Sequence, residues 1–188
     1  MAMNLCHRLC CNSARWARQV KGQLLPWVLD GADLGDNTLE IGPGYGATTR
    51  VLIDKTPRLT AVEIDAAMAQ RLQRLYGDRA HIVNADGTNT GLPAAEFSSV
   101  VSFTMLHHVP TAELQDRLFA EAFRVLRPGG VFAGSDSMSS LRFRLLHVRD
   151  TCNPVSPEEL PDRLRAIGFR DVKVDVCEGR LRWRARKG

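Results

Sequence analysis

Short apolar runs alternate with helical patterns through most of the chain from Thr38 onward. These runs are three to six residues long, which is typical of buried strands. Strands that alternate with helices predict a mostly parallel sheet covered on both faces. We expect five buried strands, at Leu39–Ile41, Leu59–Ile64, His81–Val83, Val100–Phe103 and Val131–Ala133.

Apolar residues also mark two helices between these strands. Met68, Leu72 and Leu75 share one helical face in the first. The second pattern covers residues 114–126 and ends at Arg127–Gly130, which reads Arg-Pro-Gly-Gly. We therefore expect one helix after the second strand and another before the fifth.

The regions that flank this alternation predict further elements. Met1–Leu29 could form one or two amphipathic helices, with Leu9 and Trp16 on an apolar face. Ser156–Glu159 has the pattern of a capping box before another helix, in which Pro161 would cause a kink or a later start. Two final strands are expected, at Phe169–Val176 and Leu181–Ala185.

The length of 188 residues predicts one domain, spanning residues 1–188. We expect residues 38–188 to form its core and residues 1–30 to form a helical preface. No apolar run approaches the roughly 18 residues of a membrane-spanning helix. Arg8, Arg15 and Arg18 interrupt any apolar signal-peptide region. We therefore expect a cytoplasmic protein without a membrane span.

The net charge of +4 is concentrated in two segments, Arg142–Arg149 and Arg180–Lys187. Mild basicity fits nucleic acid, an anionic substrate or a solvated surface. We favour a solvated surface because the total charge is modest. The first segment could instead form a wall of a substrate pocket, and in the second the arginines alternate with apolar residues as in a strand with one wet face.

The five cysteines are odd in number and unevenly spread, so reduced thiols are expected rather than a disulfide scaffold. Cys6, His7, Cys10 and Cys11 have helical spacing, which raises a metal or thiolate hypothesis. No second Cys/His group completes a tetrahedral zinc site. We expect no metal, and we interpret these cysteines as small buried apolar residues.

Chemistry is concentrated in Thr38–Thr49, where an apolar run ends in three alternate glycines, Gly42, Gly44 and Gly46. A strand that passes through a glycine turn into a helix lets a ligand touch bare backbone. It also points the free amides of the helix at the ligand. The acid within the run, Glu40, would carry negative charge to the same place.

This turn resembles the first motif of class I S-adenosylmethionine-dependent methyltransferases. Gly42, Gly44 and Ala47 also satisfy the looser dinucleotide pattern G-x-G-x-x-[G/A]. The glycines alone therefore do not separate S-adenosylmethionine from NAD.

Acids after the next two strands extend the resemblance. Glu63 ends the second strand, where a carboxylate can accept hydrogen bonds from both ribose hydroxyls of either cofactor. Asp65 is better explained as the cap of the following helix. Asp86 follows the third strand, where the methyltransferase family has an acid that meets the adenine amino group; an Asp-Gly turn is the alternative.

Two later segments, Phe103–Val109 and Arg124–Gly130, look like the corresponding parts of small-molecule methyltransferases of this class. The resemblance implies an α/β fold, Rossmann-like and doubly wound, with three α/β/α layers and a seven-stranded, mostly parallel sheet whose last strand is antiparallel. It implies S-adenosyl-L-methionine as cofactor and S-adenosyl-L-homocysteine as product. It assigns cofactor contacts to Glu40, Gly42, Gly44, Gly46, Glu63, Ile64, Asp86, Gly87 and Thr104.

The sequence says less about the methyl acceptor, because methyl transfer is an in-line displacement that depends mainly on how the acceptor is positioned opposite the sulfur. The first two motifs also look like those of ribosomal RNA adenine dimethyltransferases. Those enzymes carry an Asn/Asp-Pro-Pro-Tyr or Asn-Leu-Pro-Tyr segment after the fourth strand, whereas Ser102–His107 contains none. We therefore expect a small-molecule acceptor and no nucleic acid, with the oligomeric state left open. The helical preface, residues 1–30, is expected to cover the acceptor site.

No catalytic residue is assigned. His107 or His108 could remove a proton during O-methylation, although packing in the loop before Pro110 is the preferred explanation. Asp136, expected just past the fifth strand, would bind substrate or satisfy loop amides. The alternatives to a methyltransferase are a non-catalytic binding protein that kept the cofactor fold and an NAD(P)-dependent dehydrogenase.

Overall fold

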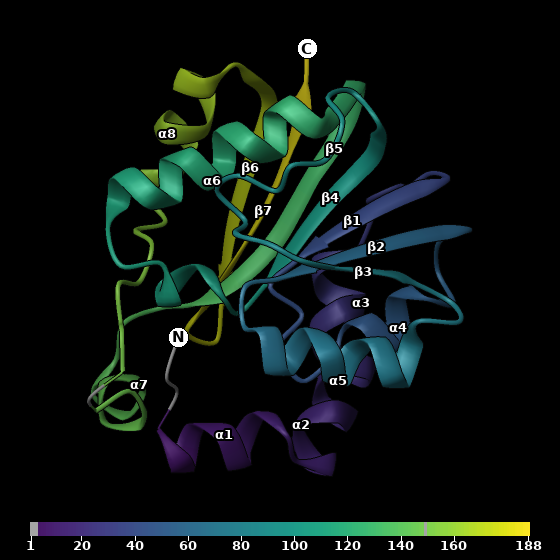
Figure 1. Ribbon diagram of the computed structural model, residues 1–188. Helices are drawn as coiled ribbons and strands as arrows, with labels where there is room; N and C mark the ends of the chain where they lie inside the picture. Colours follow the sequence, from purple (N-terminus) through teal and green to yellow (C-terminus); the bar gives the residue numbers. More distant parts are fainter. Residues whose placement is uncertain (1–3, 149) are drawn as a thin grey trace.

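A seven-stranded sheet forms the centre of the molecule (Figure 1). The computed structural model describes residues 4–148 and 150–188, without the side chains of residues 5–7, 142, 144 and 146. The strand order is β3-β2-β1-β4-β5-β7-β6. The strands are β1 (Asn37–Ile41), β2 (Arg58–Glu63), β3 (His81–Asn84), β4 (Phe97–Phe103), β5 (Leu126–Ser137), β6 (Phe169–Cys177) and β7 (Arg180–Lys187).

Strands β1 to β5 pair in parallel, and β7 pairs antiparallel with both β5 and β6. The predicted sheet with an antiparallel last strand is therefore confirmed. From β1 the chain adds β2 and β3 on one side of the sheet, and it then adds β4 and β5 on the other side, so the strand order reverses between β1 and β4. Open α/β sheets bind their ligands at such a switch point, outside the carboxyl ends of the strands.

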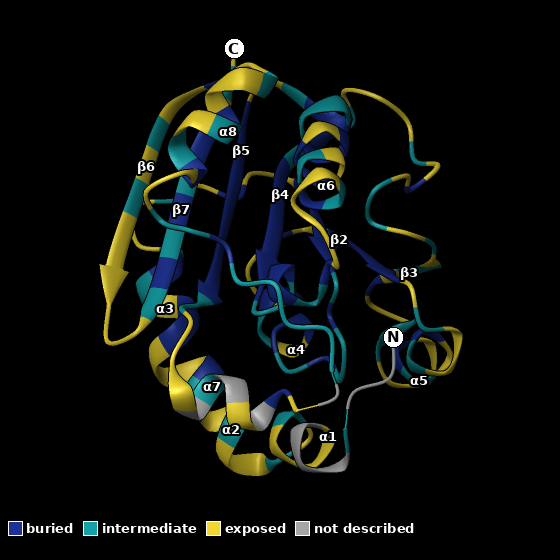
Figure 2. Cartoon of the chain, turned by 90° about the vertical axis from the view of Figure 1, so that its left-hand side faces the viewer, coloured by how far each residue is buried: buried dark blue, intermediate teal, exposed yellow. Residues whose placement is uncertain are grey.

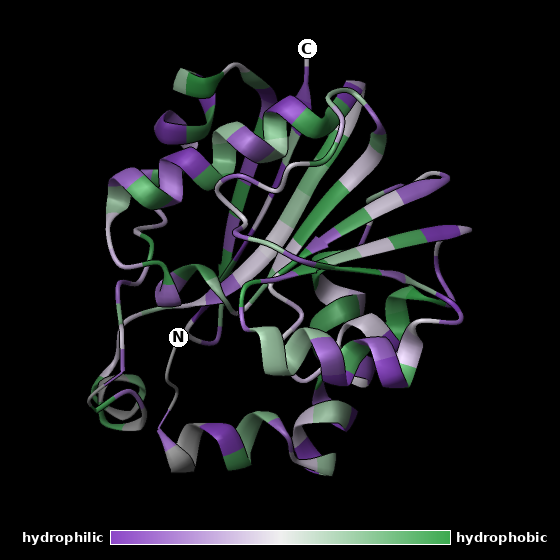
Figure 3. Ribbon diagram, viewed as in Figure 1, coloured by the Kyte–Doolittle hydropathy of each residue, from purple (hydrophilic) through white to green (hydrophobic). Residues whose placement is uncertain are grey.

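Helices cover both faces of the sheet, which gives the three layers expected (Figure 1). On one face lie α6 (Ala112–Val125) and α8 (Leu160–Ile167), and on the other α3 (Leu25–Val28), α4 (Thr49–Leu52) and α5 (Ala66–Tyr76). Alternating side chains of β4 serve the two faces, since Val100 packs in the core with α6 while Val101 packs in the core with α3. The green stripes along α6 mark its apolar residues (Figure 3).

Three predicted details of these elements are wrong. Strand β3 is not buried, because it is the edge strand of the sheet and both its ends are exposed. Leu75 is 50% exposed, because the inner face of α5 is formed by Ala69 and Leu72 instead. Strand β5 is much longer than predicted: it begins directly after α6 and includes the Arg127–Gly130 turn sequence. Residues 130–136 of β5 are all buried, and β5 is dark blue along this part in Figure 2.

The N-terminal preface forms α1 (Leu5–Cys11) and α2 (Ala14–Gln19), which continues through a π-helical turn, Val20–Leu24, into α3. Val20 and Leu24 are buried against the sheet, so the amphipathic prediction holds for this part. Leu9 is 64% exposed, contrary to the prediction. The preface therefore packs against the core through the segment that contains Val20 and Leu24.

Cys10, Cys11, Cys152 and Cys177 are free thiols, as expected, but the predicted burial of the N-terminal cysteines is wrong for Cys10. Cys10 is exposed and Cys11 is half-buried, so Cys10 does not act as a core residue. The side chains of Cys6 and His7 lie outside the described residues. Further along the chain, α7 (Leu141–Leu146) exposes Leu141 and Leu145, while the side chains of Arg142, Arg144 and Arg149 are likewise outside the description.

The C-terminal region follows the sequence pattern closely. Helix α8 begins at Leu160 with Pro161 in its first turn, which is the later start that the proline predicted. In β7, Leu181 and Trp183 are buried, while the alternating arginines lie on the opposite face and are half-buried up to Arg184. Among the described residues no helix has both the length and the apolar character that crossing a membrane requires. A cytoplasmic location stays a prediction.

Candidate functional site

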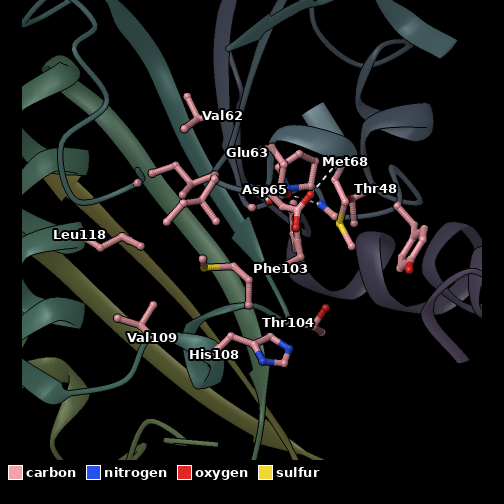
Figure 4. A pocket seen from close by; sticks show the side chains of 18 of the residues that line it. Thr48, Val62, Glu63, Asp65, Met68, Phe103, Thr104, His108, Val109 and Leu118 are labelled. Atoms are coloured by element: carbon pink, nitrogen blue, oxygen red, sulfur yellow. Dashed lines mark hydrogen bonds between the residues drawn. The ribbon is translucent and has the colours of Figure 1, made fainter. Parts of the chain in front are cut away.

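A cavity of about 190 Å³ lies at the switch point, outside the carboxyl ends of β1, β2 and β4. This volume holds far more than one water molecule. Glu63, Asp65 and Met68 gather at one end of the cavity in the close view, whereas Thr104, His108 and Val109 lie at the other (Figure 4). We call these the Glu63 end and the His108 end.

Glu63 lines the cavity although only 5% of the residue is exposed. Its Oε2 accepts the amide hydrogen of Gly44 at 2.9 Å, and its Oε1 accepts that of Asp65 at 3.0 Å. Each carboxylate oxygen can accept a second hydrogen bond. The carboxylate is therefore fixed by backbone and keeps acceptor capacity for two adjacent hydroxyls, which is what a ribose presents.

Gly44 leaves bare backbone at the same end of the cavity. Its φ is +54°, and a Cβ added there would meet no atom within 4 Å. Gly42 has a φ of +73°, and its added Cβ would lie 2.8 Å from the side chain of Met105. Both glycines line the cavity, so the turn admits a ligand against its backbone as predicted from the pattern. Together with Glu63, this open cradle fits an adenosyl cofactor.

Gly46 has a different place from the one expected. It does not line the cavity, and an added Cβ would lie 2.8 Å from the side chains of Leu72 and Tyr76 on α5. Its amide donates to the carbonyl of Pro43 at 2.9 Å rather than toward a ligand. Gly46 therefore allows the turn to pack closely on α5.

Glu40 is buried in β1 with 1% exposure and lies outside the cavity wall. The hydroxyls of Thr48 and Thr49 donate to its two oxygens, the latter at 2.7 Å. Burial, with a smaller effect from the nearby Glu63, raises the pKa of Glu40 to about 7 against the opposing effect of these hydroxyls. Thr48 lines the cavity, so Glu40 is one hydrogen bond removed from it.

The other predicted contacts on this side lie where the sequence placed them. Ile64, Asp86 and Gly87 line the cavity. Asp86 is exposed and accepts the amide hydrogen of Thr88 at 2.8 Å, so it also makes the turn that was its alternative role. Asp65 caps α5 by accepting the amide hydrogen of Met68, as expected.

Thr104 lines the cavity after β4 in a strained conformation. Its φ is +51°, which is unusual for a β-branched residue. A 2.7 Å hydrogen bond from its amide to the carbonyl of Ser135 holds it there. Such strain persists where surrounding structure imposes it, and it is common at ligand sites.

Several lining residues were not assigned to the cofactor site from the sequence. Cys11 and Trp16 come from the preface, and Met68 comes from α5. Trp16 had a signal in its amphipathic spacing, whereas the spacing of Cys11 indicated only a metal or thiolate group or a buried apolar residue. The wall is completed near the His108 end by apolar side chains, namely Phe103, Met105, Val109, Pro110, Leu114 and Leu118.

His107 and His108 lie in a 3-10 turn, Leu106–His108, at the edge of the cavity. His107 is 2% exposed, and its Nδ1 lies 2.5 Å from Oδ1 of Asp136. Oδ2 of Asp136 accepts the amide hydrogen of His107 at 2.9 Å. His107 therefore packs in the interior, whereas His108 lines the cavity.

Asp136 lies within β5 and not past it, which corrects its predicted position. The strand extends this far because it pairs with β7, where Asp136 is opposite Leu181. Asp136 is fully buried and does not line the cavity, and it accepts amide hydrogens from His107 and Ser137. Of its two predicted roles, the structure shows the satisfaction of loop amides.

A third histidine, His147, reaches the same place from the end of α7. It is 4% exposed, and its ring centre lies 4.8 Å from that of His107. Its Nδ1 lies 2.8 Å from the carbonyl oxygen of Phe143. Burial lowers the pKa of His147, in opposition to that contact.

Comparison with known proteins identifies the family. A profile described as "Methyltransferase domain" matches residues 39–134, which is just over half of the chain. The chain belongs to the methyltransferase domain family. Ribosomal RNA small subunit methyltransferase A of Mycobacterium avium is 30% identical over 159 residues, which cover 68% of this chain and 46% of that protein. The chain thus spans less than half the length of this curated relative.

Solved structures share the fold. A SAM-dependent methyltransferase from Archaeoglobus fulgidus matches with a TM-score of 0.75 and 18% identity over 91% of this chain and 94% of that one. The structure described as "PigF with SAH" matches with a TM-score of 0.64 and 24% identity, covering 81% of this chain and 50% of that one. With the family match, they confirm the predicted class I methyltransferase fold and its cofactor, S-adenosylmethionine.

Proposed function

We propose that this methyltransferase domain transfers the methyl group of S-adenosylmethionine to a small-molecule acceptor. The observation that carries the proposal is a single cavity with a carboxylate cradle at the Glu63 end and a mainly apolar wall at the His108 end. The cofactor supplies an activated methyl group on a sulfonium. The chain's task is then to hold two molecules in line and to exclude water.

The described residues divide this work between the two ends of the cavity. Glu63 accepts hydrogen bonds from the ribose hydroxyls, and the bare backbone at Gly44 lets the cofactor approach closely. Asp86 receives the adenine amino group. At the His108 end, Val109 and Leu114 bury the apolar part of an acceptor and keep water away from the methyl group.

A nucleic-acid acceptor is the second candidate, because ribosomal RNA methyltransferases are among the relatives. Two observations weigh against it. The segment after β4 offers no Asn-Leu-Pro-Tyr for a flipped base. Two arginines of β7 already bind within the chain: Arg182 donates to the carbonyl of Trp27, and Arg184 donates to that of Asp30 at 2.9 Å. The basic tail thus stabilises the end of α3.

A labelled-donor assay separates the two candidates. The chain is incubated with methyl-labelled S-adenosylmethionine and either a metabolite extract or deproteinised RNA from the same cells. We expect label in products of low mass and none in RNA, and Gly44→Val as the control should transfer none. Label confined to RNA would contradict the proposal. Absence of label in every fraction, with S-adenosylhomocysteine still bound, would favour a non-catalytic binding protein.

A further inference from the structure

Three imidazoles converge beside the His108 end of the cavity. Each of His107, His108 and His147 offers one ring nitrogen, and these three atoms lie within 4.8 Å of one another. The residues come from two separate segments, the turn after β4 and the end of α7. Their ring centres are 4.2 to 5.5 Å apart. The fold thus brings together three ligands of the kind that late first-row metal ions prefer.

The surrounding hydrogen bonds orient two of these rings. Asp136 can only accept at Nδ1 of His107, so the ring's hydrogen is on Nδ1 and the lone pair is on Nε2. The carbonyl of Phe143 imposes the same tautomer on His147. Histidines that bind metals usually donate their other ring hydrogen to a carboxylate or a backbone carbonyl in this way. Both supports are present here before any metal is considered.

Geometry and burial are compatible with a metal ion. Ligand nitrogens around tetrahedral zinc are about 3.3 Å apart, since each bond is about 2.0 Å long. The three nitrogens here, which lie within 4.8 Å of one another, would need to approach by at most about 1.5 Å. His107 and His147 are almost fully buried, whereas His108 borders the cavity. A three-histidine set also leaves a fourth coordination position open.

We propose that His107, His108 and His147 form a binding site for a divalent late first-row cation such as Zn²⁺. Nitrogen ligands disfavour Mg²⁺ and Ca²⁺, which prefer oxygen. The ion would lie at the edge of the cavity, because His108 lines it. If the proposed methyl transfer is correct, the open position would bind the oxygen or sulfur of the acceptor. The metal site itself does not depend on that function.

Packing is the competing explanation, because Phe143 lies 4.2 Å from His147 and 5.0 Å from His107 between ring centres. A purely aromatic cluster would not need nitrogen. His147→Phe preserves an aromatic ring of similar size and removes the ligand atom. It therefore distinguishes a metal site from a packed cluster.

Cobalt titration tests the proposal. Chain freed of metal by a chelator is titrated with Co²⁺, whose visible absorption reports nitrogen ligation in a four-coordinate site. We expect a single tight Co²⁺ that Zn²⁺ displaces, with affinity roughly 100-fold weaker in His147→Phe and in His108→Ala. Asp136→Asn, which removes the negative charge beside His107 and replaces one of its two acceptor oxygens with a donor, should weaken binding roughly 10- to 100-fold. His81→Ala is the matched control, because His81 is exposed on β3, and it should leave binding unchanged.

Three results would overturn the proposal. The first is equal Co²⁺ affinity in the original chain and in His147→Phe, with both folded by circular dichroism. The second is a thiolate charge-transfer band, which would assign the metal to cysteine. The third is a loss in His81→Ala as large as in His147→Phe. S-adenosylhomocysteine binding is measured separately on each variant, so failure of the metal site is distinguishable from failure of the cofactor site.

Discussion

The Glu63 end and the His108 end of the cavity are built in different ways. At the Glu63 end the carboxylate is held by amides only two and 19 residues away, within the turns that follow β1 and β2. At the His108 end, His107 is fixed by Asp136, 29 residues further along the chain. His147 then joins from the end of α7. One end is thus assembled from neighbouring strand exits, and the other from distant segments.

This difference separates a general task from a particular one. The Glu63 end presents acceptors and bare backbone, which suit a ribose in any molecule of this fold. The His108 end combines apolar walls with imidazoles, which is where an acceptor would be distinguished. Mutations at the Glu63 end should therefore alter cofactor affinity. Mutations at the His108 end should alter metal or acceptor binding and leave cofactor affinity unchanged.

The largest effect is expected at Gly44. Gly44→Val should reduce binding of S-adenosylhomocysteine below detection by calorimetry, because the branched side chain would occupy the open space where the cofactor contacts backbone. Gly129→Val is a matched control: Gly129 also has a positive φ, of +75°, and open space for a Cβ, but it lies at the opposite end of the sheet. Unchanged affinity in Gly44→Val, or equal loss in both variants, would refute this placement.

A smaller effect is expected from the buried charge of Glu40. Its pKa in the fold, about 7, is above the ordinary value of 4.5 for a glutamic acid. Between these values the folded chain keeps a proton that the unfolded chain loses, so stability falls as pH rises through this window. As the pH rises from below to above this window, the free energy of unfolding of the original chain should therefore fall by roughly 3 kcal/mol more than that of Glu40→Gln.

Urea unfolding below and above this window measures the difference directly. The control is Glu40→Gln, which keeps the size of the side chain and does not titrate. If both proteins change equally in stability between the two conditions, then Glu40 is ionised in the fold and the pKa assignment is wrong. The result would leave the Glu63 cradle untouched, since Glu40 does not line the cavity.

The sequence was informative wherever a local motif determines the structure. The glycine turn, the acid at the end of β2 and the cap at Asp65 all follow from short patterns and have the predicted positions. The position of Gly46 against α5, outside the cavity, could not be predicted, because it depends on how α5 packs. The extent of β5, and with it the burial of Asp136, depended on pairing with β7.

The histidine cluster shows the same limit more strongly. No motif or spacing in the sequence links His147 to His107. The expectation of no metal rested on cysteine and histidine spacing alone. Only the packing of α7 beside the turn after β4 brings these rings together. Long-range assembly of this kind leaves no periodic pattern in a single sequence.

The central claim is that Glu63 holds the ribose of an adenosyl cofactor at the switch point of the sheet. Calorimetric titration of S-adenosylhomocysteine and, separately, of NAD into the original chain and into Glu63→Ala tests it most directly. We expect S-adenosylhomocysteine to bind and NAD not to, and Glu63→Ala to weaken binding by about 1.5–3 kcal/mol, the scale of hydrogen bonds to a charged group. Equal affinity in both proteins, or binding of NAD alone, would contradict the account.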